Sequence, residues 1–166
     1  FTIKFWKQIF PGAKVIHIYR NPIDSVSSYI ERDLEVKNRF EWNWKKKLKR
    51  EWLISRNFHQ NFRLVDIESG FSLWKEYVSE AVSLKSQFEH FLEIRYEDFL
   101  SDPKGKILEL SEFTGIRPTS EQVHREISQI NSGRAYAFTS NPDYVASYQK
   151  LKNDPLLKQL GYGAIL

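Results

Sequence analysis

The chain has 166 residues, of which 41% are hydrophobic and 15% aromatic, which is enough apolar material for the core of a single domain spanning residues 1–166. The absence of cysteine excludes disulfides, thiolate metal sites and a cysteine nucleophile, and without a signal-like start or a long apolar run we expect a cytoplasmic protein. The net charge of +4 suits an anionic ligand without identifying one.

The first residues have the pattern of a helix that has already begun. Ile3, Trp6, Ile9 and Phe10 fall at helical spacing, only Thr2 is placed to cap them, and the chain contains no methionine. We therefore expect an N-terminally truncated domain, with a processed or tagged chain as the alternative.

A strand, a turn and a helix come next. Val15, Ile16 and Ile18 make a short apolar run within residues 14–19, which predicts a buried parallel strand there. Arg20 follows directly, and Asn21 and Pro22 are the residue types preferred at the N-cap and the first position of a helix. A helix is therefore predicted from Pro22 onward.

The segment 35–65 is less regular and carries a basic run at 45–50 beside tryptophans. We interpret it as a peripheral helix, because a charge run is usually a solvated helix face. A basic patch with aromatic residues can also follow a nucleic-acid backbone, which makes a basic interaction module one alternative. The segment could instead cap an acceptor site or pack against a partner, and its charge would then suit an anionic acceptor such as a glycan.

The next predicted helix starts near Ser69 or Gly70 and leads into a second buried strand over residues 91–96. A short turn is predicted at 97–100. Asp102 then has the residue type of an N-cap for another helix.

The C-terminal third is predicted to be mostly helical. Gly115 stands where a helix C-terminus needs a glycine, and Thr119 to Gln122 fits a capping box. Residues 131–141 are predicted to be irregular, and one or two short helices close the chain. Because two buried strands alternate with long helices, the fold class is α/β with a parallel sheet. Two strands are too few for a free-standing sheet, so we expect the rest of the sheet to come from outside this chain.

The junction after the first strand has the chemistry of an anion site. The carboxyl end of a parallel strand is where α/β folds bind ligands, and the following helix N-terminus favours negative charge. Arg20 adds a guanidinium suited to phosphate or sulfate. An arginine in this place is nevertheless more often solvated or ion-paired than a ligand.

Residues 11–29, PGAKVIHIYRNPIDSVSSY, resemble the 3′-phosphate-binding motif of PAPS-dependent sulfotransferases. The resemblance implies that Arg20 and Ser28 hold the 3′-phosphate of the nucleotide. It also implies a partial P-loop-NTPase-like, three-layer fold, with parallel strands flanked by helices and a helix-rich C-terminal part.

A second stretch, residues 94–103 with the sequence IRYEDFLSDP, is similar to the second signature of the same family. That similarity implies that Tyr96 lies near the adenine. We interpret Glu97 and Asp98 as structural carboxylates that can accept from backbone amides at the turn. The sequence NSGR at 131–134 shares a glycine and an arginine, in a different order, with a loop that closes over the nucleotide, so Arg134 is a further nucleotide-binding candidate.

The family's Gly-containing phosphosulfate loop does not occur in this sequence. The catalytic residues are therefore unknown: the resemblance implies that the general base and the loop lysine lie upstream of Phe1. His17 is interpreted as a packed strand residue rather than the base.

The resemblance implies sulfuryl transfer from PAPS to a hydroxyl or amine of a glycan, lipid or small molecule, without a metal, and predicts that this chain alone is inactive. The alternatives are another P-loop-type enzyme such as a small-molecule kinase, a non-catalytic PAP-binding module, or the basic interaction module. Nucleic acid is the less favoured partner, and the sequence leaves a homo-oligomer open.

Overall fold

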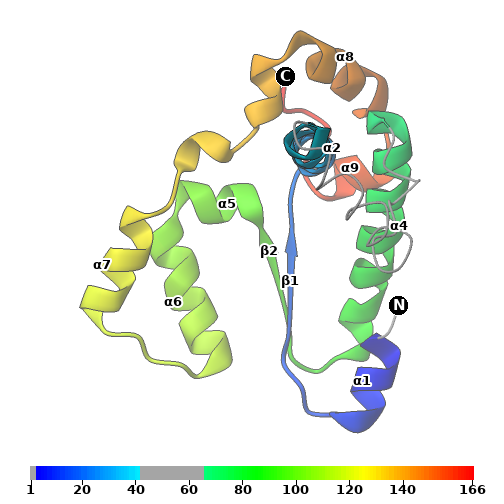
Figure 1. Ribbon diagram of the computed structural model, residues 1–166. Helices are drawn as coiled ribbons and strands as arrows, with labels where there is room; N and C mark the ends of the chain where they lie inside the picture. Colours follow the sequence, from blue (N-terminus) through cyan, green and yellow to red (C-terminus); the bar gives the residue numbers. More distant parts are fainter. Residues whose placement is uncertain (1–2, 42–65) are drawn as a thin grey trace. The chain divides into compact units, whose positions relative to one another are not determined.

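The computed structural model describes residues 3–41 and 66–166 (Figure 1). The chain divides into two compact units, one comprising Phe1–Asn21 and Glu76–Ala137, the other Pro22–Lys75 and Phe138–Leu166. The predicted basic, tryptophan-rich segment falls mainly within residues 42–65, outside the described residues.

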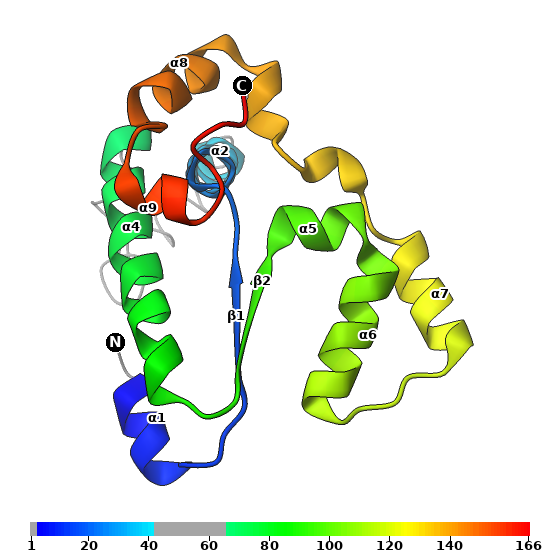
Figure 2. The ribbon, with the colours of Figure 1, turned by 180° about the vertical axis from the view of Figure 1, so that it is seen from behind.

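The first unit is built around a small parallel sheet. Its strands are β1 (Val15–Tyr19) and β2 (Phe91–Arg95), which lie side by side in both views (Figures 1 and 2). Its helical elements are α1 (Ile3–Ile9), η1 (Lys85–Gln87), α5 (Tyr96–Ser101), α6 (Pro103–Thr114), α7 (Ser120–Ser128) and η2 (Ser132–Arg134). Parallel strands flanked by helices confirm the predicted α/β class.

The register of the sheet decides which ends of the strands meet. Val15 pairs with Phe91 at one end and Tyr19 pairs with Arg95 at the other. Both strands therefore end at the same edge, and the residues that follow them, Arg20 and Tyr96, start from neighbouring positions.

One face of β1 is more exposed than the sequence predicts. Ile16 is 39% exposed and Ile18 58% exposed, whereas His17 and Tyr19 on the opposite face are half-buried. The prediction of a buried strand is therefore wrong for this face. The physical reason is that successive side chains of a strand point to opposite faces of the sheet, and this face is left uncovered within the described residues.

The second unit contains α2 (Pro22–Glu41), α8 (Pro142–Leu151) and α9 (Pro155–Gln159), with α2 packed against α8. Its most buried large side chains include Ile23, Phe138, Tyr148, Leu157 and Tyr162. The Tyr148 hydroxyl donates to the carbonyl of Tyr162 at 2.9 Å, so this buried polar group is satisfied inside the core.

Two elements, α4 (Ile67–Leu84) and η3 (Ala137–Ser140), run across the boundary between the units along the chain. Helix α4 begins earlier than predicted because Asp66, not Ser69 or Gly70, caps it: Asp66 Oδ1 accepts the backbone N–H of Ser69 at 2.8 Å. Tyr77 on this helix is 54% exposed.

Three other predicted helix signals are confirmed. Asp102 caps α6 by accepting from the Gly105 N–H at 2.9 Å, and Gly115 ends that helix at a φ of 82°, which a side chain would disfavour. Thr119 and Gln122 form the reciprocal capping box of α7. Two predictions are wrong: residues 97–100 lie in α5 rather than in a turn, and the segment 131–141 contains η2 and η3.

Candidate functional site

The candidate site lies at the edge of the sheet where both strands end. Arg20 directly follows β1, and Tyr96, placed by the sequence at the end of the strand, is the first residue of α5. The guanidinium carbon of Arg20 lies 5.1 Å from the centre of the Tyr96 ring. At this separation the ring face attracts the cation, so the two predicted site residues form one half-buried pair.

The third predicted residue lies against the same arginine. Nη2 of Arg20 donates to the backbone carbonyl of Arg134 at 2.7 Å. The turn η2 that supplies this carbonyl is capped by Asn131, whose Oδ1 accepts from the Gly133 N–H at 3.0 Å, and it lies against α5. The structure therefore brings Arg20, Tyr96 and residue 134 together, but it is the carbonyl of Arg134 that contacts Arg20.

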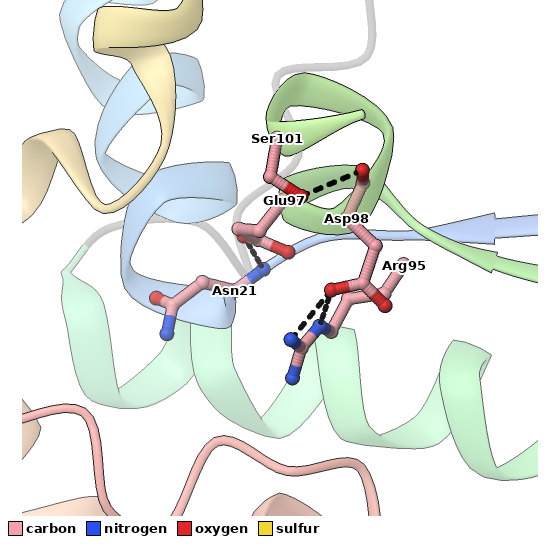
Figure 3. Close-up of polar contacts among 5 residues, drawn as sticks. All are labelled: Asn21, Arg95, Glu97, Asp98 and Ser101. Carbon is pink, nitrogen blue, oxygen red and sulfur yellow. Dashed lines mark hydrogen bonds and ion pairs between the residues drawn. The ribbon is translucent and has the colours of Figure 1, made fainter. Parts of the chain in front are cut away.

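A buried carboxylate supports the junction after Arg20. Glu97 is 4% exposed, and its Oε1 accepts the backbone N–H of Asn21 at 2.9 Å (Figure 3). Asn21 is itself fully buried. The prediction that Glu97 accepts from a backbone amide is confirmed. The amide, however, is not in the turn after β2: it follows β1 and lies 76 residues away along the chain.

The neighbouring carboxylate has a different role. Asp98 Oδ1 accepts from both Nε and Nη2 of Arg95, at 2.9 and 2.5 Å (Figure 3). Its backbone carbonyl accepts from the Ser101 hydroxyl at 2.9 Å. The contact of the Asp98 carboxylate is thus with a side chain on its own segment, not with the backbone amide that we predicted.

The sheet carries a row of ionisable side chains on the face that includes His17. His17 Nδ1 lies 3.7 Å from Oε1 of Glu93, and Glu93 also pairs with Lys85. Burial lowers the pKa of His17, and the Glu93 carboxylate opposes this shift. Burial and the same carboxylate raise the pKa of Tyr19. The His17 ring packs between Tyr19 and Phe91, with centroid separations of 5.4 and 6.3 Å, as expected of a packed strand residue.

The fourth predicted residue, Ser28, is half-buried on α2 and belongs to the second unit. In the same unit Asp24 is 2% exposed, and its Oδ1 accepts the backbone N–H of Phe138 at 2.8 Å. This contact fixes the start of α2 to the segment that begins at residue 138. Sequence reasoning missed it because no local pattern links positions 114 residues apart.

Within residues 3–41 and 66–166, no group of three or more His, Cys, Asp or Glu side chains is arranged to hold a metal ion. Nor does any helix of this part of the chain have the length and apolar character needed to cross a membrane.

The protein-family model of the sulfotransferase domain matches residues 4–156. The chain belongs to the sulfotransferase family. The match includes Arg20, Ser28, Tyr96 and Arg134, and it confirms the resemblance seen in the two motifs. No curated protein and no solved structure matched the chain in the corresponding searches. As a sulfotransferase, the chain is assigned to the enzymes that transfer sulfuryl groups.

Proposed function

We propose that this sulfotransferase uses PAPS as its donor, and that the described chain supplies the 3′-phosphate and adenine side of the nucleotide site. The contact of the Arg20 guanidinium with the Tyr96 ring, at the edge of the sheet where both strands end, carries the proposal. A guanidinium held in this way can bind a phosphate through two parallel hydrogen bonds. Tyr96 offers an aromatic surface next to it for a base.

The roles of the residues follow from what each can offer a nucleotide. Arg20 binds the 3′-phosphate, and Tyr96 holds the guanidinium in place and lies near the adenine. Arg134 is exposed on η2, where its side chain can reach an anion while its carbonyl fixes Arg20. The assignment of Ser28 to the same phosphate rests on the motif at residues 11–29 and is a prediction from the sequence.

The reaction itself needs groups beyond these. An acceptor hydroxyl or amine forms a bond to sulfur while the bond from sulfur to the nucleotide's phosphate oxygen breaks. The acceptor proton passes to a base, and PAP leaves with the electron pair of the broken bond. Such a transfer depends mainly on positioning and on stabilising charge at the transferring group, by analogy with phosphoryl transfer. Arg20, Tyr96 and Arg134 serve positioning, and the general base is assigned to no residue of this chain.

The acceptor is proposed only by its reacting group, a hydroxyl or an amine, on a glycan, a lipid or a small molecule. A small-molecule kinase also surrounds phosphates with arginines and helix N-termini, but the family match favours the sulfotransferase. A non-catalytic PAP-binding role uses the same site and differs only in the absence of turnover.

Discrimination between nucleotides tests the donor assignment. The purified chain is titrated with PAP, AMP and ADP by isothermal calorimetry. We expect PAP to bind at least about tenfold more tightly than AMP or ADP, since each tenfold step corresponds to about 1.4 kcal/mol, the size of one charge-assisted contact. Equal affinities for the three nucleotides, or a preference for ADP, would reject PAPS as the donor and favour the kinase alternative.

A further inference from the structure

Glu97 is a buried carboxylate that accepts a hydrogen bond from a backbone amide of another segment. Glu97 is 4% exposed and lies on α5, one residue after Tyr96. Its Oε1 accepts the backbone N–H of Asn21, one residue after Arg20, at 2.9 Å (Figure 3). Tyr96 and Glu97, which are consecutive on α5, therefore contact Arg20 and Asn21, which are consecutive after β1.

The Asn21 amide needs such an acceptor. It is fully buried, and β1 has ended at Tyr19, so the amide lies beyond the paired part of the sheet. A buried N–H without an acceptor is costly, and therefore the position of the Glu97 side chain constrains where the backbone of Asn21 can lie. Because Arg20 precedes Asn21 directly, the same contact constrains the backbone from which the Arg20 side chain extends.

The two contacts act on opposite ends of the arginine. Tyr96 contacts the guanidinium from 5.1 Å, and Glu97 fixes the peptide that follows the arginine's Cα. A guanidinium forms two parallel hydrogen bonds to a phosphate only when its plane faces the phosphate oxygens at hydrogen-bonding distance. A small shift of the Arg20 backbone would therefore weaken the contact with the phosphate.

We infer that Glu97 is a positioning residue for Arg20: it orients the arginine toward the 3′-phosphate without touching the nucleotide. The inference rests on the proposed function for the identity of the ligand, and on Figure 3 for the contact itself. It predicts that loss of the Glu97 acceptor weakens the binding of PAP much more than the binding of AMP, which lacks the 3′-phosphate.

Three variants separate positioning from general stability. Glu97→Met keeps most of the side-chain volume and removes the acceptor, whereas Glu97→Gln keeps an acceptor oxygen at the same place. Asp98→Asn is the matched control, because Asp98 is the adjacent carboxylate on the same helix and bonds to Arg95 instead of Asn21. Circular dichroism and thermal unfolding establish which variants are folded at the temperature of the titrations.

Calorimetric titration with PAP and AMP gives the decisive ratio. In Glu97→Met we expect PAP affinity to fall about tenfold, the size of one charge-assisted hydrogen bond lost between the displaced Arg20 and the phosphate, with AMP affinity nearly unchanged. Glu97→Gln should restore most of the PAP affinity, and Asp98→Asn should leave the ratio of PAP to AMP affinities at the wild-type value. A folded Glu97→Met variant with the wild-type ratio would overturn the inference.

A measurement without nucleotide tests the positioning role of Glu97 separately from the proposed binding of PAPS. NMR of the labelled chain follows the Asn21 amide and the Arg20 side-chain N–H resonances. We expect both to shift, and the Asn21 amide to exchange faster with solvent, in Glu97→Met and not in Asp98→Asn. Unchanged Arg20 resonances would overturn the positioning role whatever the ligand is. Wild-type chain that fails to prefer PAP over AMP would reject the proposed function, and with it the 3′-phosphate as the target of Arg20.

Discussion

The guanidinium of Arg20 lies 5.1 Å from the centre of the Tyr96 ring, although the two residues are 76 positions apart in the sequence. The contact follows from the register of the sheet, which pairs Tyr19 with Arg95 and so starts the two following residues at adjacent points. In the proposed nucleotide site, this single contact between an arginine and an aromatic ring would supply both the cation and the flat surface.

Replacement of Tyr96 tests the aromatic part of this pair. Tyr96→Phe keeps the ring and should bind PAP almost as the wild type does, whereas Tyr96→Leu should lose about 0.5–2 kcal/mol of PAP binding, the range for a cation–π contact. Titration calorimetry measures both. The exposed Tyr77→Leu serves as control. An equal loss in the Phe and Leu variants would show that the hydroxyl, and not the ring face, carries the effect.

The proposed contact of Ser28 with the 3′-phosphate can be tested by substitution, with the neighbouring Ser27 as the control. Ser28→Ala should weaken PAP binding by about 1.5–3 kcal/mol, the range for a hydrogen bond to a charged group, and leave AMP binding nearly unchanged. Ser27→Ala is the comparison, because Ser27 is buried and its hydroxyl donates to the carbonyl of Asp24 at 3.4 Å. If Ser27→Ala lowers PAP affinity as much as Ser28→Ala does, the assignment of Ser28 is wrong.

The pH dependence of stability tests the environment of His17. Burial lowers the pKa of His17 below its ordinary value of 6.5, with Glu93 opposing the shift, so the folded chain binds this proton less readily than the unfolded chain does. The stability contributed by the neutral ring is complete above pH 6.5 and is lost as the pH falls toward the lower pKa of the folded state.

Urea unfolding at pH 7.5 and at pH 5.5 measures the effect. The wild type should lose more stability on acidification than His17→Phe, which keeps an aromatic ring between Tyr19 and Phe91. The exposed His124→Gln should behave like the wild type. The same loss in His17→Phe as in the wild type would contradict the assignment.

Asp154 is predicted to stabilise the second unit in two ways. Its Oδ1 caps α9 by accepting from the Leu156 N–H at 2.8 Å, and its Oδ2 pairs with Lys75 at 2.6 Å. Burial alone would raise the pKa of Asp154, but the hydrogen bonds from Lys75 and the backbone lower it overall.

Asp154→Ala should lower the free energy of unfolding by about 1–2 kcal/mol, because it removes an N-cap. Asp154→Asn keeps the cap and loses only a partly exposed ion pair, so it should cost less than about 1 kcal/mol. Chemical denaturation of both variants measures the difference. Equal losses would mean that the ion pair, rather than the cap, dominates.

Local signals predicted most of the fold. The capping residues Asp102, Thr119 and Gln122, and Gly115 at the end of α6, act within a few positions of themselves, so their residue types report directly on their structure. Helix α4 starts earlier than its apolar pattern predicts, because Asp66 caps it.

Contacts between distant parts of the chain could not be predicted in the same way. The bond from the Asn21 amide to Glu97 and the bond from Arg20 to the carbonyl of Arg134 join residues 76 and 114 positions apart. A sequence pattern identifies the arginine, but only the register of the sheet and the placement of η2 show what holds it. The exposure of Ile16 and Ile18 cannot be predicted for a similar reason, since it depends on what packs against that face of the sheet and not on the strand's own sequence.

The most direct test of the nucleotide site is a binding cycle in which PAP and AMP are each titrated into the wild type and into Arg20→Ala. Removal of the 3′-phosphate and removal of the guanidinium should then not be additive. We predict that the wild type prefers PAP by at least about tenfold, which is about 1.4 kcal/mol, and that Arg20→Ala binds PAP and AMP with nearly equal affinity. A folded Arg20→Ala variant that retains the full preference for PAP would show that Arg20 does not bind the 3′-phosphate.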